Sequence, residues 1–183
     1  MGISHLIEFC LKISGAIAIV FQDLEVSIIV MTEILFYHLQ RQPLERVLPL
    51  LLEKTLDRGW KAVIRCGSAE RLAALDDSLW TWRENSFLPH GTHVEGIGEA
   101  QPLYLTLEYE RPNAADVLFL VDGAPLDDKT LESPPYTRIV LMFDGNDEEQ
   151  LSRARASWKE VTSLNLTATY WQQDESDKWV KKA

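Results

Sequence analysis

A nearly unbroken run of apolar residues of strand length, residues 32–38, sets the strongest constraint on the fold of this chain. Ile34 and Phe36 alternate with Leu35 and Tyr37 along it, so both sides of an extended strand would carry large side chains. Such a strand needs cover on both faces, which is typical of a parallel sheet flanked by helices. The run therefore predicts a central strand with helices on either side of its sheet.

The next segments follow the order strand, helix, strand, helix. Pro43 begins a run of leucines and valines at helical spacing, which Arg58 and Gly59 end. Residues 60–66 have strand character, and Ser68 is placed to cap a second helix. This is the order of a parallel βαβ unit. We therefore expect a single α/β domain with a mainly parallel, twisted, Rossmann-like sheet and helices on both faces.

More strands are predicted further along the chain. β-Branched and aromatic residues favour strands at residues 103–107, 117–121, 138–143 and 167–173. With those already described, the sheet should have about five to seven strands, which is the usual size.

An amphipathic helix is predicted over residues 147–162, because acidic residues occupy its first turn and cations lie towards its end. Trp158 belongs to its apolar stripe, and Arg155 with Lys159 forms an i,i+4 pair beside that stripe. Trp158 therefore lies on the border between the core and a basic face. It is either a core tryptophan beside two solvated cations or the floor of a half-open pocket with a cationic rim, suited to a carboxylate-bearing peptide.

A loop with unusual aromatic content is predicted at residues 86–93, after Trp80. Phe87 either pins this loop to the core or contributes to an exposed apolar patch that binds a protein partner. The loop histidines, His90 and His93, are expected to be solvated.

The charge of the chain bears on its partners. With a formal net charge of -10, the protein repels nucleic acid, so direct nucleic-acid binding is disfavoured. The cations Arg155 and Lys159 form a local positive island that suits a small acidic ligand. Cys10 and Cys66 are too few and too poorly placed for a disulfide framework or a zinc site, which fits a reducing cytoplasm.

No pattern in the sequence indicates catalysis, a metal or a cofactor. The chain lacks phosphate-loop, hydrolase-elbow and zinc-protease motifs, and its histidines have no accompanying ligands or bases. An alternative of a different class is a small nucleotide-binding enzyme that uses the C-terminal edge of the sheet, where open α/β sheets hold ligands. No motif supports that alternative.

Several short motifs follow one another in a distinctive order. They are Arg58-Gly59-Trp60-Lys61, Leu75-Asp76-x-x-Leu79-Trp80-Thr81, Ser86-Phe87-Leu88-Pro89-His90-Gly91, Gln101-Pro102, Phe143-Asp144-Gly145, Ala154-Arg155-x-x-Trp158-Lys159 and Tyr170-Trp171-Gln172-Gln173. In this order, from Met31 to about Lys182, they resemble the chi subunit of bacterial DNA polymerase III holoenzyme.

The resemblance implies a non-catalytic accessory subunit that joins the clamp-loader assembly to single-stranded-DNA-binding protein. Recognition would consist of capturing the acidic, phenylalanine-ended C-terminal tail of that protein. Arg155 and Lys159 would engage carboxylates of the tail, and Trp158 would pack against its apolar end. Asn165 stands where the family usually has glycine, and asparagine tolerates the same left-handed helix end.

The resemblance also implies a second partner and a domain boundary. Trp80, Phe87 and Pro89 would form the face that contacts the psi subunit. Because the resemblance begins at Met31, we expect residues 31–183 to form the chi-like domain. We interpret residues 1–30 as an N-terminal extension read from an upstream start codon, poorly ordered or loosely docked.

Overall fold

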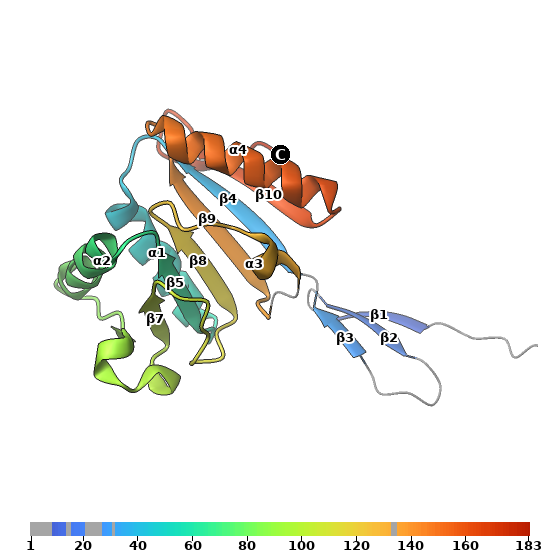
Figure 1. Cartoon of the computed structure of the whole chain (residues 1–183), viewed down its shortest axis with the longest axis horizontal. Helices are drawn as coiled ribbons and strands as arrows, with labels where there is room; N and C mark the ends of the chain where they lie inside the picture. Colours follow the sequence, from blue (N-terminus) through green and yellow to red (C-terminus); the bar gives the residue numbers. More distant parts are fainter. Residues whose placement is uncertain (1–8, 14–15, 21–26, 31, 133–134) are drawn as a thin grey trace, which may run out of the picture.

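The computed structural model describes residues 9–13, 16–20, 27–30, 32–132 and 135–183. One large sheet forms the centre of a single α/β domain (Figure 1). Its strands are β4 (Glu33–Leu39), β5 (Ala62–Cys66), β6 (His90–Gly91), β7 (Leu103–Thr106), β8 (Val117–Val121), β9 (Arg138–Asp144), β10 (Thr167–Gln173) and β11 (Trp179–Lys181). They lie in the order β11-β10-β4-β9-β8-β5-β7-β6. All neighbours are parallel except β10 and β11, which confirms the predicted fold class.

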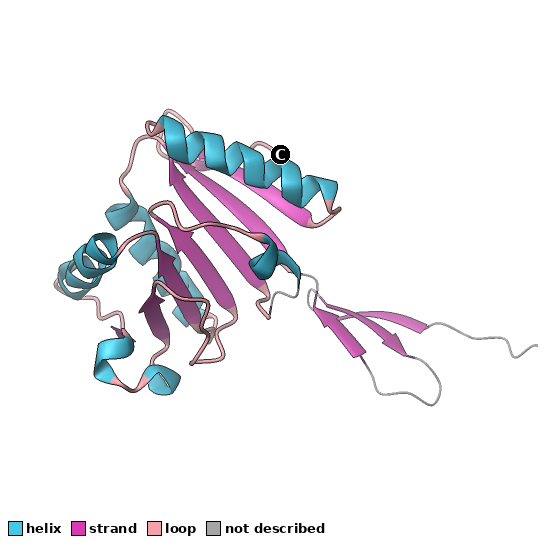
Figure 2. Cartoon of the chain, viewed as in Figure 1, coloured by secondary structure: helices cyan, strands magenta, loops and turns pink. Residues whose placement is uncertain are grey.

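Helices cover both faces of this sheet, as Figure 2 shows. On one face lie α1 (Leu44–Asp57) and α2 (Ala69–Thr81), whose buried leucines share a core cluster with the sheet. On the other lie α3 (Asp128–Glu132) and α4 (Glu148–Ser163), which contribute to a second cluster. Two short 3-10 helices, His93–Glu95 and Gly98–Ala100, connect β6 to β7.

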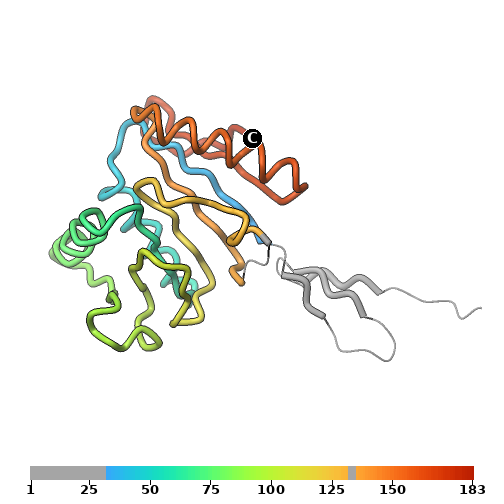
Figure 3. The backbone as a smooth tube through the Cα atoms, viewed as in Figure 1, coloured from blue at the N-terminus to red at the C-terminus, as the bar shows by residue number. Residues whose placement is uncertain are grey.

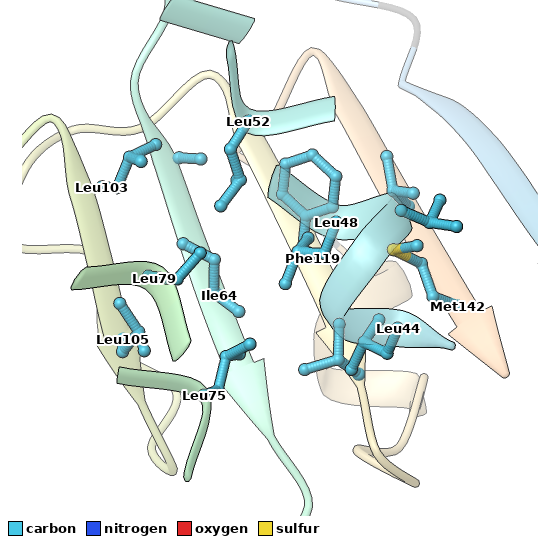
Figure 4. Packing of buried hydrophobic residues seen from close by; sticks show 14 of the residues in the cluster. Leu44, Leu48, Leu52, Ile64, Leu75, Leu79, Leu103, Leu105, Phe119 and Met142 are labelled. Atoms are coloured by element: carbon cyan, nitrogen blue, oxygen red, sulfur yellow. The ribbon is translucent and has the colours of Figure 1, made fainter. Parts of the chain in front are cut away.

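The alternation predicted for the first central strand is present in β4. Leu35 packs into the core cluster under α1, whereas Ile34 and Phe36 pack into the cluster under α4. In Figure 4, Leu48 and Leu52 of α1 lie over the sheet strands that carry Ile64 and Phe119. Burial on both faces explains why residues 34–36, in the middle of this run, are all large and apolar.

The ends of α4 follow from its sequence. The Asp147 carboxylate accepts hydrogen bonds from the backbone N–H groups of Glu149 and Gln150, which caps the first turn. Asn165 follows the helix with φ of 56°, the left-handed conformation expected at this position.

The sheet has eight strands rather than the predicted five to seven, because the sequence gives no signal for β6 and β11. These strands span two and three residues, too few to show a period of two. β11 follows a turn in which the Asp174 carboxylate accepts from the backbone N–H groups of Ser176 and Lys178. The backbone trace in Figure 3 ends beside β10, where the Ala183 carbonyl accepts from the N–H of Tyr170.

A small antiparallel sheet precedes the domain in the sequence, and among the described residues its strands do not pair with those of the large sheet. It consists of β1 (Phe9–Ile13), β2 (Ala16–Val20) and β3 (Ser27–Val30). The prediction of an upstream start and a poorly ordered extension lies partly outside the described residues and stays a prediction. Among the helices that the structure describes, none combines the length and hydropathy needed to cross a membrane.

Candidate peptide-binding face

The ring of Trp158 is half-buried between α4 and the sheet. It meets Phe36 edge to face, with ring centroids 5.1 Å apart, and Tyr170 in the same way at 5.7 Å. Phe36 is fully buried and lies opposite Tyr170 in the pairing of β4 with β10. Such aromatic pairs contribute about 0.5–1.5 kcal/mol beyond their buried area, so the orientation of the Trp158 ring is well defined.

Arg155 and Lys159 lie exposed on the same side of α4, next to Trp158. Within the described ranges, neither side chain takes part in an ion pair. Arg153, by contrast, pairs with Glu149 and donates to the Gly123 carbonyl. The two cations beside Trp158 are therefore available to an external anion, whereas Arg153 is already engaged.

His38, at the end of β4, lies close to Arg155 and was not singled out by the sequence analysis. Its Nδ1 is 3.0 Å from the hydroxyl of Tyr170, and its ring stacks on Phe143 with centroids 5.0 Å apart. A Cβ at Gly145 would clash with the His38 Nε2, so only glycine fits over the imidazole. His38 and Tyr170 were read as strand residues, and the parallel pairing of β4 with β10 is what brings them together.

Arg155 is the cation of this face that acts on His38 and Tyr170. Burial lowers the pKa of His38, and the Arg155 guanidinium lowers it further against the opposing carboxylate of Asp144. His38 is therefore neutral at physiological pH. Burial also raises the pKa of Tyr170, which Arg155 partly offsets, so the phenol keeps its proton. The arrangement supplies cations and hydrogen-bonding rings over an apolar floor, which is the chemistry of anion recognition.

Trp80 and Phe87 form an exposed aromatic pair at the end of α2, on the opposite face of the sheet from α4. Their side chains are 57% and 70% exposed, and their ring centroids are 6.1 Å apart. Pro89 beside them is half-buried. The alternative in which Phe87 pins the loop to the core is wrong, because the neighbouring Leu88 does so with 2% exposure.

The expectation that His90 is solvated is also wrong. Its side chain is buried; Nδ1 lies 2.6 Å from the Leu88 carbonyl oxygen, and Nε2 lies 3.3 Å from the Asp76 carboxylate. Trp80 covers the imidazole at 4.6 Å between centroids. His90 thus fixes the loop that presents Phe87 beside Trp80 of α2, a role that its position beside a proline did not reveal.

A hollow of about 330 Å³ lies at the C-terminal ends of β4 and β9. β4 leads into α1 on one face and β9 leads into α4 on the other, which is where open α/β sheets bind ligands. Its charged lining comprises Glu45, Asp122 and Asp144 against Arg41 and Arg71.

That balance of charge is unfavourable for a phosphate-bearing ligand. Arg71 already pairs with Glu45 at 2.7 Å and with Asp122 at 3.0 Å, so little positive charge remains for an anion. Among the residues with described placement, no group of three or more His, Cys, Asp or Glu side chains is arranged to hold a metal ion. The geometry therefore gives no support to the nucleotide-binding alternative.

Comparison with known proteins places this chain in a family. Residues 31–169 match the family described as DNA polymerase III chi subunit, HolC. The chain belongs to this family. The matched region contains the Trp80–Phe87 aromatic pair and, on the α4 face, His38, Arg155, Trp158 and Lys159, whereas Tyr170 of that face directly follows it. Membership confirms the resemblance drawn from the ordered motifs.

Two relatives of the chi family show how far the similarity extends. A probable DNA polymerase III subunit chi from Rickettsia prowazekii (strain Madrid E) is 29% identical over 125 residues, covering 66% of this chain and 75% of that protein. DNA polymerase III subunit chi from Escherichia coli (strain K12) is 26% identical over 115 residues, covering 62% of this chain and 76% of that protein. The setting of this chain is thus DNA replication by DNA polymerase III.

Proposed function

We propose that this chain is a non-catalytic, cytoplasmic accessory subunit that links the clamp-loader assembly to single-stranded-DNA-binding protein by binding its acidic C-terminal tail. One observation carries the proposal: in the described part of the chain, Arg155 and Lys159 have no ion-pair partner and lie beside the half-buried ring of Trp158. On a chain with a net charge of -10, such a local cationic face selects a short acidic segment over a long polyanion.

Each residue of the face has a distinct part in this proposal. The guanidinium of Arg155 forms charge-assisted hydrogen bonds with a tail carboxylate, and the ammonium of Lys159 adds a second positive charge one turn later. The exposed edge of Trp158 packs against the apolar end of the tail. The phenol of Tyr170, held by His38, borders the same surface.

Arg155→Ala is expected to weaken binding of a synthetic acidic, phenylalanine-ended peptide by about 1.5–3 kcal/mol, the value of a hydrogen bond to a charged group. The free energy of unfolding should change by less than about 1 kcal/mol, because an exposed cation contributes little to folding. Lys159→Ala should act in the same direction. Isothermal titration at low and high salt measures both effects, and binding should weaken as salt rises.

Arg153→Ala is the matched control, since Arg153 lies on the same helix but is engaged by Glu149 and Gly123. It should leave peptide affinity nearly unchanged. Equal affinity of the Arg155→Ala variant and the parent protein would place the peptide site elsewhere on the surface.

The exposed aromatic pair forms the second contact of the proposal, with a psi-like subunit. Phe87→Ala should weaken that association by about 2 kcal/mol, because aromatic side chains at the centre of an interface often dominate its affinity. Stability should change by no more than about 0.5 kcal/mol, as Phe87 is 70% exposed. Thermal melting and a binding assay with the partner subunit measure the two quantities.

Leu164→Ala is a suitable control for this interface, because Leu164 is an exposed apolar residue that follows α4, on the opposite face of the sheet from α2. It should not affect the association. An unfolded Phe87→Ala variant, or one that binds the partner subunit as tightly as the parent, would contradict the assignment.

A further inference from the structure

A cationic groove of about 290 Å³ lies on the face of the sheet that α1 covers, the opposite face from α4. It is bounded by the last two turns of α1, by Trp60, and by the N-terminal halves of β4, β8 and β9. Its apolar floor includes Phe119 and Val140, which are almost fully buried. The groove therefore reaches the core from the surface and is separate from the proposed tail-binding face.

The charged groups that line this groove are Lys54, Arg58 and Arg138, against the single carboxylate of Glu33. Arg138 donates to Glu33 through Nε at 2.9 Å and through its terminal nitrogen at 2.6 Å. Lys54 and Arg58 have no ion-pair partner in the described part of the chain. The groove thus carries an excess of positive charge on a chain whose net charge is -10.

The ring of Trp60 lies against two of these cations. The guanidinium carbons of Arg58 and Arg138 lie 5.7 and 5.5 Å from the centroid of the Trp60 ring, within the range of cation–π attraction. Burial raises the pKa of Tyr37, and Arg138 and Arg58 oppose that rise while Glu33 adds to it. The positive charges of both guanidinium groups are therefore felt at Tyr37, inside the groove.

The other aromatic rings at the groove pack against one another. Tyr37 stacks on Trp171 with centroids 6.4 Å apart and meets Trp179 edge to face at 4.8 Å. Trp60 already has two guanidinium groups over its ring. A nucleic-acid base needs an open ring face on which to stack, and these rings already have aromatic or cationic partners. A branched aliphatic side chain can pack on the apolar floor without that requirement.

We propose that this groove binds a short acidic segment of a partner protein, with carboxylates at Lys54 and Arg58 and one bulky apolar side chain on the aromatic floor. The volume of about 290 Å³ is slightly smaller than the roughly 300–1,000 Å³ typical of drug-sized ligands, which suits one bulky side chain rather than a whole small molecule. The charge also fits, since short acidic segments complement an isolated basic patch. The site does not depend on the proposed tail-binding function.

A synthetic pentapeptide with a central leucine flanked by aspartates, blocked at both termini, is the probe. Its blocked C-terminus removes the terminal carboxylate of a tail. Titration of the full chain should quench tryptophan fluorescence, and the indole N–H resonance of Trp60 should shift in NMR spectra. The double variant Lys54→Ala/Arg58→Ala should bind at least about tenfold more weakly, as loss of charge-assisted hydrogen bonds predicts.

Two control variants distinguish binding in the groove from binding at the other cationic surfaces of the domain. Arg46→Ala removes an exposed cation from the same helix but outside the groove, and it should bind the probe like the parent protein. Arg155→Ala should also retain the Trp60 shift, because α4 lies on the other face. Loss of probe binding in Arg155→Ala but not in the double variant would overturn the groove assignment and leave the α4 proposal standing.

Two further arms test the chemistry of the occupant. A pentapeptide with asparagines in place of the aspartates should lose most of the affinity, and a thymidine octanucleotide should not shift the Trp60 resonance. Equal binding of the uncharged peptide, tighter binding of the oligonucleotide, or the absence of any probe binding would each overturn the proposal.

Discussion

Trp158→Ala is expected to lower the free energy of unfolding by about 3 kcal/mol and to weaken tail-peptide binding. The ring packs against the fully buried Phe36 and against Tyr170, so truncation leaves a void under α4. Burial of the ring is incomplete, which puts the expected loss at the lower end of the roughly 3–5 kcal/mol seen for large aromatic truncations. Urea denaturation measures the stability and isothermal titration measures the binding.

Trp158→Phe is the matched control, because it keeps an aromatic ring against Phe36 and removes only part of the volume. We expect it to recover most of the lost stability while binding the peptide more weakly than the parent protein. A Trp158→Ala variant with unchanged stability would show that the ring is not part of the core cluster. Unchanged peptide affinity would instead remove Trp158 from the binding face.

Gly67→Ala is expected to be the most disruptive glycine substitution in the domain outside the α4 face. A Cβ at Gly67, directly after β5, would clash with the backbone carbonyl oxygen of Asp122, directly after β8. Because backbone rather than a flexible side chain is in the way, the ends of two adjacent strands must separate. Overpacking usually costs about 1–3 kcal/mol, and we place this case at about 3 kcal/mol.

Gly59→Ala provides the comparison for that prediction. Gly59 has φ of 72°, and no atom of the described residues lies within 4 Å of an added Cβ, so its substitution adds left-handed backbone strain without a clash, at about 1–2 kcal/mol. Urea denaturation measures both losses of stability, because a lower midpoint with an unchanged m-value reports a lower free energy of unfolding. A Gly67→Ala variant no less stable than Gly59→Ala would mean that the strand ends move apart easily.

The local elements of the fold could be predicted because their signals are local. The apolar run of β4, the cap at Ser68 and the acidic start of α4 each follow from spacing and side-chain chemistry within one segment. Elements of two or three residues, such as β6 and β11, are too short for such a signal and form by pairing with a longer neighbour.

The candidate site was predictable only in part, for the same reason. Arg155, Trp158 and Lys159 share one helix, so their spacing placed them on one face. His38 and Tyr170 join that face from strands that are far apart in the chain but adjacent in the sheet, and no spacing rule relates them. The exposed Phe87 and the buried His90 show the same limit, because a loop sequence does not specify which side chain turns inward.

The sequence by itself thus determined the three longer helices, the longer strands, the α/β class and, through ordered motifs, the chi family, whereas α3 and the two 3-10 helices were not predicted. Only the tertiary structure decided that β4 lies between β10 and β9, that Arg155 faces His38 and Tyr170, and that Arg58 and Arg138 meet around Trp60. The physical reason is that periodicity records burial along a single element. Contacts between elements depend instead on how the whole chain packs both faces of one sheet.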